Sequence, residues 1–136
     1  MLYFAYGANT NIEGMKHRCP KAKLLGPITL PDWKLVFRGV ADIENVFGKE
    51  VHGVVWRITD TCEKSLDGFE GYPYLYGKRC FPVKLEDGTI EDVMFYKMNR
   101  EGYGLPSDGY FNCIKDGYKA NGLPISALYS SLPSSA

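Results

Sequence analysis

Glu70 is the side chain in this sequence best placed to exchange protons. It ends a predicted helix over residues 61–70 and stands between Phe69 and a Gly71-Tyr72-Pro73 turn. A carboxylate at the C-terminal end of a helix meets the negative end of the helix dipole, and apolar neighbours raise its pKa further. Both effects favour a general acid or base, and an ordinary solvated glutamate is the competing interpretation.

A second candidate for chemistry is the glycine-containing loop Tyr6-Gly7-Ala8-Asn9, which follows an apolar run at residues 2–6. The run predicts a strand buried on both faces. Glycine lets the backbone turn sharply, so the following main-chain N–H groups can be presented to an anion. A helix that starts directly after the loop would add the positive end of its dipole. A tight strand-to-helix turn without a ligand is the alternative.

Composition narrows the possible partners. The chain has 136 residues, with 16 Lys plus Arg against 16 Asp plus Glu, so no excess charge indicates nucleic acid or an anionic membrane surface. A small neutral or zwitterionic ligand is more natural. No apolar run approaches the roughly 20 residues of a membrane span, and we expect a cytosolic protein. The four cysteines lack Cys-x-x-Cys spacing, so neither a zinc site nor another metal or cofactor is expected.

Capping and turn residues outline the remaining elements. Helices are expected from the capping-box pattern Thr10 to Glu13 up to Pro20, over 61–70 with Gly71 as C-cap, from Ser107 or Asp108 to Asn121-Gly122, and over 124–132. Strands are expected within residues 21–46, with breaks at Pro27, Pro31 and Gly39, and over 51–58 after a turn around Gly48. Two further strands, 76–85 and 90–98, are expected to form a hairpin around Asp87-Gly88. Residues 133–136 should form a frayed tail.

These elements predict one α+β domain spanning residues 1–136, because no repeat, linker or low-complexity tract divides the chain. Strands outnumber helices, and strict strand-helix alternation is missing. We therefore expect a small mixed, partly closed β-barrel with flanking helices.

Four fragments of the sequence resemble the γ-glutamylcyclotransferase family in the same order. They are Phe4-Ala5-Tyr6-Gly7-Ala8-Asn9, Gly53-Val54-Val55-Trp56, Ser65-Leu66-Asp67-x-x-Glu70-Gly71, and Pro106-Ser107-x-x-Tyr110 with Gly122-Leu123-Pro124. Together they cover nearly the whole chain. The resemblance implies a small mixed barrel that cleaves a γ-glutamyl amide, releases an amine or amino acid and leaves 5-oxoproline, without a cofactor. The implied partner is one small γ-glutamyl compound, and a homodimer is left open.

The same resemblance implies roles for particular residues. The family's Tyr-Gly-Ser-Asn loop falls on Tyr6, Gly7, Ala8 and Asn9, and its acid/base glutamate falls on Glu70. Family tyrosines near the ligand fall on Tyr96 and Tyr110, and a further one falls on Tyr74 or Tyr76, of which Tyr76 is preferred. Ala8 stands where the family has serine, which leaves the substrate preference open.

Three alternative functions remain, and Ala8 keeps the first of them open. The protein could act on γ-glutamylamines or glutathione instead of γ-glutamyl amino acids, it could be a binding module that retains the pocket, or it could be a structural domain without a ligand. An intact Glu70 argues against the second alternative, and the glycine loop argues against the third.

Overall fold

Five strands form one mixed sheet in the order β2-β3-β1-β5-β4 in the computed structural model, which describes residues 1–134. The strands are β1 (Leu2–Ala5), β2 (Lys23–Phe37), β3 (Ala41–Arg57), β4 (Tyr76–Lys84) and β5 (Ile90–Met98). β1 lies in the centre, antiparallel to β3 and parallel to β5. All four of its residues are buried, as the uninterrupted apolar run predicts.

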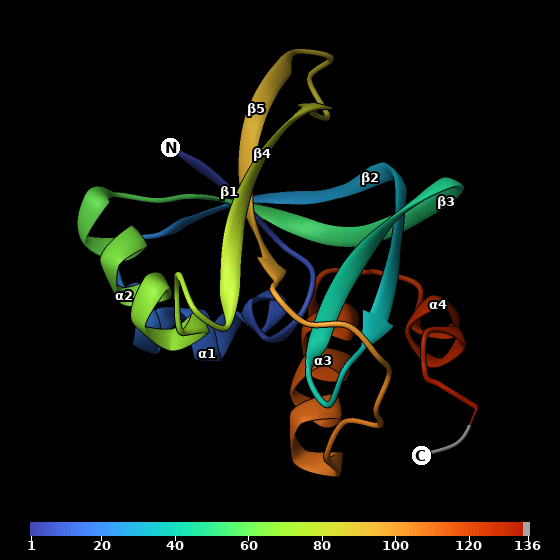
Figure 1. The fold of residues 1–136 in the computed structure, drawn as a ribbon. Helices are drawn as coiled ribbons and strands as arrows, with labels where there is room; N and C mark the ends of the chain where they lie inside the picture. Colours follow the sequence, from blue (N-terminus) through green and yellow to red (C-terminus); the bar gives the residue numbers. More distant parts are fainter. Residues whose placement is uncertain (135–136) are drawn as a thin grey trace.

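The helices cover one side of this sheet. They are α1 (Ile12–Arg18), α2 (Asp60–Glu70), α3 (Asp108–Ala120) and α4 (Ile125–Ser130), and a short 3₁₀ turn, η1 (Ala8–Thr10), precedes α1. In Figure 1, α1 and α2 lie together at the left and α3 and α4 at the right, whereas the β4–β5 hairpin projects away from all four. The α+β class with flanking helices is thus confirmed.

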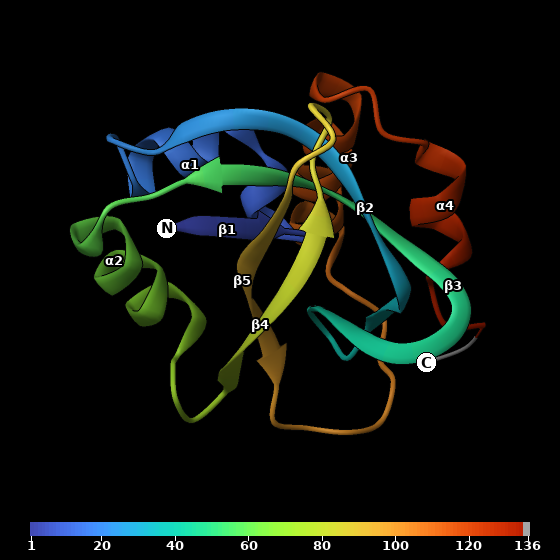
Figure 2. The ribbon, with the colours of Figure 1, turned by 90° about the horizontal axis from the view of Figure 1, so that it is seen from above.

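The sheet itself is open, so the expected partial closure into a barrel is not found. Its edges are β2 and β4, and no pairing between them is seen in residues 1–134. The two long strands β2 and β3 instead curve together through a wide arc (Figure 2). Register shifts at Leu24/Gly26 and Pro31/Trp33 accompany this bend. Both prolines of β2 are tolerated because β2 is an edge strand.

The prediction of a turn around Gly48 is wrong. Gly48 lies inside β3, where residues 46–49 bulge opposite Asp32 of β2. The Asp32 carboxylate accepts a hydrogen bond from the Gly48 amide at 3.0 Å, and both residues have positive φ angles, 67° for Asp32 and 82° for Gly48. The bulge therefore absorbs the turn-forming residues without ending the strand.

The helix caps agree more closely with the sequence. α2 begins at Asp60, one residue before the expected start, and its cap is Thr59, whose side chain accepts from the Cys62 amide. It ends as expected at Gly71, which has the left-handed conformation. α3 is capped by Ser107 as predicted. The cap of α1 is Asn11 and not Thr10, because the Thr10 hydroxyl donates to the Gly7 carbonyl at 2.8 Å. The expected tail at 133–136 falls partly on residues 135 and 136, which lie outside the described part.

Candidate active site

A cavity of about 130 Å³ opens where the N-terminal loop, the β2–β3 hairpin, α2, α3, the start of β4 and the end of β5 meet. All eight residues that the sequence singled out line it: Tyr6, Gly7, Ala8, Asn9, Glu70, Tyr76, Tyr96 and Tyr110. The remaining lining residues are Tyr3, Val40, Ala41, Phe69 and Leu75. The structure thus brings together residues from four separate parts of the sequence.

The Gly7 to Asn9 segment lines this cavity and carries main-chain N–H groups that have no acceptor in the described part of the chain. Thr10 and Asn11 use their amides to close the 3₁₀ turn on Gly7 and Ala8. Within residues 1–134, no acceptor is found for the amides of Gly7, Ala8 or Asn9. Such amides require an acceptor from solvent or from a ligand. The α-helix begins only at Ile12 and is capped by Asn11, so the predicted direct strand-to-helix transition is replaced by the 3₁₀ turn.

Packing behind the loop holds these donors in place. Asn9 is buried, its side-chain amide donates to the Tyr3 hydroxyl at 2.9 Å, and its carbonyl accepts from the Trp56 indole at 2.9 Å. α3 approaches the loop so closely at Gly117 that a Cβ atom at this position would overlap the Thr10 hydroxyl. The Gly7 to Asn9 segment, called the cradle from here on, is therefore held by buried contacts to the sheet and to α3.

Glu70 is the last residue of α2 and is partly buried in the cavity wall. Burial raises the pKa of its carboxyl group to about 7, and the positive charge of Arg18 opposes this rise. The direction agrees with the raised pKa expected from the sequence. At neutral pH such a carboxyl group is divided between its charged and neutral forms, so it can both accept and donate a proton.

Two tyrosines on the wall share the main chain of Ala41. Tyr76 donates to the Ala41 carbonyl at 2.7 Å, and the Ala41 amide donates to the Tyr110 hydroxyl at 3.0 Å. Of Tyr74 and Tyr76, between which the sequence left a choice, Tyr76 is the one that lines the cavity. Tyr76 is 5% exposed and lines the cavity, whereas Tyr74 is 88% exposed.

The other two tyrosines are held from the sheet and from α2. Tyr6 donates to the Tyr96 carbonyl at 2.6 Å, and Tyr96 donates to the Asp67 carboxylate at 2.6 Å. Lys78 in turn pairs with Asp67 at 2.8 Å. Burial raises the pKa of Tyr6 and Tyr96, so both remain neutral hydrogen-bonding groups near pH 7.

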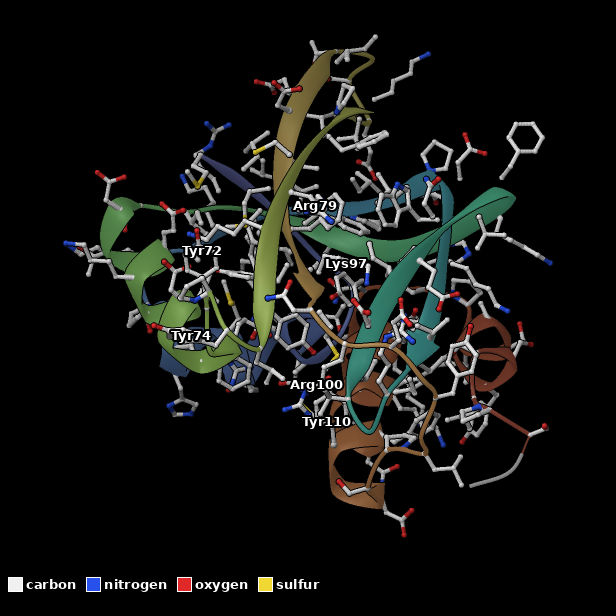
Figure 3. All side chains as sticks on the ribbon, in the orientation of Figure 1. Tyr72, Tyr74, Arg79, Lys97, Arg100 and Tyr110 are labelled. Carbon is white, nitrogen blue, oxygen red and sulfur yellow. The ribbon has the colours of Figure 1, made fainter. Side chains whose placement is uncertain are left out.

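The hairpin that supplies Ala41 is anchored by a buried carboxylate that the sequence reasoning missed. Asp42 is 0% exposed and accepts from Arg38 at 2.8 Å, from Lys97 at 2.8 Å and from the Met98 amide at 2.9 Å. Lys97, which is labelled in Figure 3, belongs to β5. Asp42 therefore ties the β2–β3 hairpin to the strand that carries Tyr96. No local pattern distinguishes Asp42 from a surface aspartate.

Arg18 and Tyr3 were missed as well. Tyr3 belongs to the buried run, and Arg18 looks like one of several basic residues in the last turn of α1. Only tertiary packing shows that both contact Asn9. In residues 1–134, no group of three or more potential metal ligands comes together, and no helix there is long and apolar enough to cross a membrane.

An open mixed sheet, a cavity with a proton-exchanging glutamate, and free amides beside it define the architecture of a small-molecule enzyme site. A family model described as "Gamma-glutamyl cyclotransferase, AIG2-like" matches residues 3–113. The chain is 34% identical over 137 residues to γ-glutamylcyclotransferase of Bos taurus, covering 91% of this chain and 73% of that protein. The Homo sapiens protein of the same name gives the same identity and coverage.

Solved structures show the same relationship. A γ-glutamyl cyclotransferase structure superposes with a TM-score of 0.86 at 31% identity, covering 96% of this chain and 85% of the other. An uncharacterized protein from Homo sapiens superposes with a TM-score of 0.85 at 30% identity, covering 99% and 90%. The chain belongs to the γ-glutamyl cyclotransferase, AIG2-like family and is an enzyme of that kind.

Proposed function

We propose that this protein cleaves a γ-glutamyl compound by intramolecular cyclisation, leaving 5-oxoproline and releasing an amine or an amino acid. Family membership supports the reaction type. The observation that carries the proposal to this chain is the position of Glu70, whose carboxyl group has a pKa of about 7 and lines the same cavity as the free amides of Gly7 to Asn9.

The reaction needs little from the protein beyond folding the substrate and moving protons. The substrate's own α-amine attacks its γ-carbonyl, so nucleophile and electrophile are already tethered. Well-oriented intramolecular attack can reach effective molarities of about 10⁵ M or more. The α-ammonium group must lose one proton before its nitrogen can attack and a second as the lactam forms, and the departing nitrogen must gain one.

Glu70 is suited to these proton transfers. An α-ammonium group has a pKa of about 8 in solution, close to the value of about 7 for Glu70. The Glu70 carboxylate takes the first proton from the α-ammonium group and passes it to water, which leaves a neutral amine that can attack. It then takes the second proton from the ring nitrogen, and the resulting carboxylic acid protonates the leaving nitrogen as the C–N bond breaks, which returns Glu70 to its starting state.

The amides of Gly7, Ala8 and Asn9 bind a negatively charged part of the substrate, either its α-carboxylate or the oxyanion that develops at the γ-carbonyl. This role depends on the main chain, so it survives the presence of alanine at position 8. Tyr76 and Tyr110 form part of the wall around the bound substrate.

A panel assay tests the proposal. The purified protein is incubated separately with γ-glutamyl amino acids, γ-glutamylamines and glutathione, and 5-oxoproline is measured by mass spectrometry. Formation of 5-oxoproline from at least one class, above a control without enzyme, is the expected result. Calorimetric binding of a compound without any 5-oxoproline would instead identify a binding module, and the proposal would be withdrawn.

A further inference from the structure

The guanidinium group of Arg18 lies between three other residues, Asn9, Gly14 and Phe69. Its Nε donates to the Asn9 side-chain oxygen at 2.7 Å, and its Cζ lies 4.1 Å from the centre of the Phe69 ring. On another side is Gly14, where a Cβ would come within 2.6 Å of Nη2. Glycine inside a helix costs about 1 kcal/mol relative to alanine, and here the bare backbone makes room for the guanidinium group.

One end of this guanidinium group has no partner. Nη2 is buried, and no hydrogen-bond acceptor contacts it within residues 1–134. None of the ion pairs in that part of the chain includes Arg18. A buried donor on an unneutralised cation is costly. Packing alone does not explain why a cation stands here.

The charge acts on the groups around the cavity. It opposes the burial that raises the pKa of Glu70, and it acts in the same direction on Tyr3, Tyr110 and Cys113. The titratable groups coupled electrostatically to Glu70 are Arg18 of α1, Tyr3 of β1, Tyr6 just after it, Tyr76 of β4, Tyr96 of β5 and Tyr110 of α3. Among these, Arg18 is the cation.

Arg18 also sets the orientation of the Asn9 side chain. Because Arg18 is a pure donor, the Asn9 oxygen must face it and the Asn9 nitrogen must face Tyr3. Asn9 contributes one of the free amides of the cradle. A single side chain therefore touches both the anion-binding loop and the surroundings of Glu70.

We propose that Arg18, clamped between Gly14 and Phe69, is a positioning residue that fixes Asn9 and places a positive charge beside Glu70, the neighbour of Phe69 in the chain. Its importance for turnover rests on the proposed function. Its effect on the ionisation of Glu70 does not, so the two can be tested separately.

The direct test is a ¹³C NMR titration of the Glu70 carboxyl carbon, assigned by its loss in Glu70→Gln. Arg18→Gln should raise the midpoint by roughly one pH unit, because a nearby positive charge is removed. Gly14→Ala should raise it as well, because the added methyl group displaces the guanidinium group, and alanine favours the helix. Lys16→Gln is the matched control. It removes the same charge from an exposed side chain of the same helix and should leave the midpoint unchanged.

Kinetics then test the consequence. If the midpoint rises from about 7 to about 8, kcat/KM of Arg18→Gln at pH 7 should fall roughly fivefold relative to wild type and recover towards pH 9. The ratio of variant to wild type cancels the titration of the substrate itself. A merely structural loss would persist at every pH.

The outcomes separate cleanly. An upward midpoint in Arg18→Gln and Gly14→Ala, with Lys16→Gln unchanged, supports the proposal even if no substrate is turned over. An unchanged midpoint in both variants, or in Gly14→Ala alone should Arg18→Gln fail to fold, overturns it. An equal rise in Lys16→Gln also overturns it, since position would then not matter.

Discussion

The hydroxyl of Tyr76 donates to the main-chain carbonyl of Ala41 at 2.7 Å, which ties the start of β4 to the β2–β3 hairpin across the cavity. Tyr76→Phe removes this donor from the carbonyl of a buried residue. We expect a loss of about 1–3 kcal/mol in the free energy of unfolding, together with a lower kcat/KM.

Urea unfolding and steady-state kinetics of the variant measure both effects. Tyr74→Phe is the matched control, because Tyr74 is 88% exposed two residues away. Its stability should stay within about 0.5 kcal/mol of wild type. A destabilised Tyr74→Phe beside a neutral Tyr76→Phe would contradict the assignment of Tyr76 to the cavity wall.

The ionisation of Glu70 should destabilise the folded protein. Its pKa is about 7 when folded and has a reference value of 4.5, so between these values the folded state binds more protons than the unfolded state. Stability contributed by this group is present below pH 4.5 and is lost as the pH rises through about 7. Glu70→Gln lacks this loss and should be more stable than wild type at pH 8 by about 1–2 kcal/mol, after allowance for solvent screening.

Urea midpoints of both proteins from pH 4.5 to 8 give the comparison. The advantage of Glu70→Gln should shrink as the pH falls. Glu13→Gln, at an exposed carboxylate, should show no such trend. Equal stability of Glu70→Gln and wild type at every pH would show that the carboxyl group is not perturbed.

Ala8→Ser should change substrate preference more than the chemical step. One additional hydrogen bond is worth roughly 0.5–1.5 kcal/mol, which allows up to about a tenfold effect on KM for some γ-glutamyl compounds. The reason is that the cradle binds anions chiefly through main-chain amides. Measuring kcat and KM of both proteins on the same panel of γ-glutamyl compounds tests this prediction. An inactive parent with an active serine variant would mean that the natural protein is a binding remnant.

Much of the fold could be predicted because the signals are local. The buried run of β1, the Asp87-Gly88 hairpin and the caps at Ser107 and Gly71 each depend on a few neighbouring residues. The turn predicted around Gly48 was wrong because a glycine with a positive φ angle occurs in bulges as well as in turns. The openness of the sheet was missed because closure depends on whether the edge strands β2 and β4 meet, which no local pattern states.

The site divides in the same way. Glu70 and the Tyr6 to Asn9 loop could be found because a glutamate at a helix end and a glycine after a buried strand are visible in the sequence. Arg18 and Asp42 could not, because their roles arise from contacts across the fold: Arg18 with Asn9 and Phe69, and Asp42 with Lys97. The chemical roles of the site residues, the cytosolic location and a homodimer remain predictions.

The most direct test of the account is kcat of Glu70→Gln on the best substrate of the panel, with Glu13→Gln as the matched control. The glutamine variant keeps the size and shape of the side chain but cannot carry the proton. We expect a correctly folded protein whose kcat falls by about 10²-fold or more, whereas Glu13→Gln retains wild-type kcat. Wild-type kcat in folded Glu70→Gln would contradict the account, because the proton transfers would then proceed without the residue assigned to them.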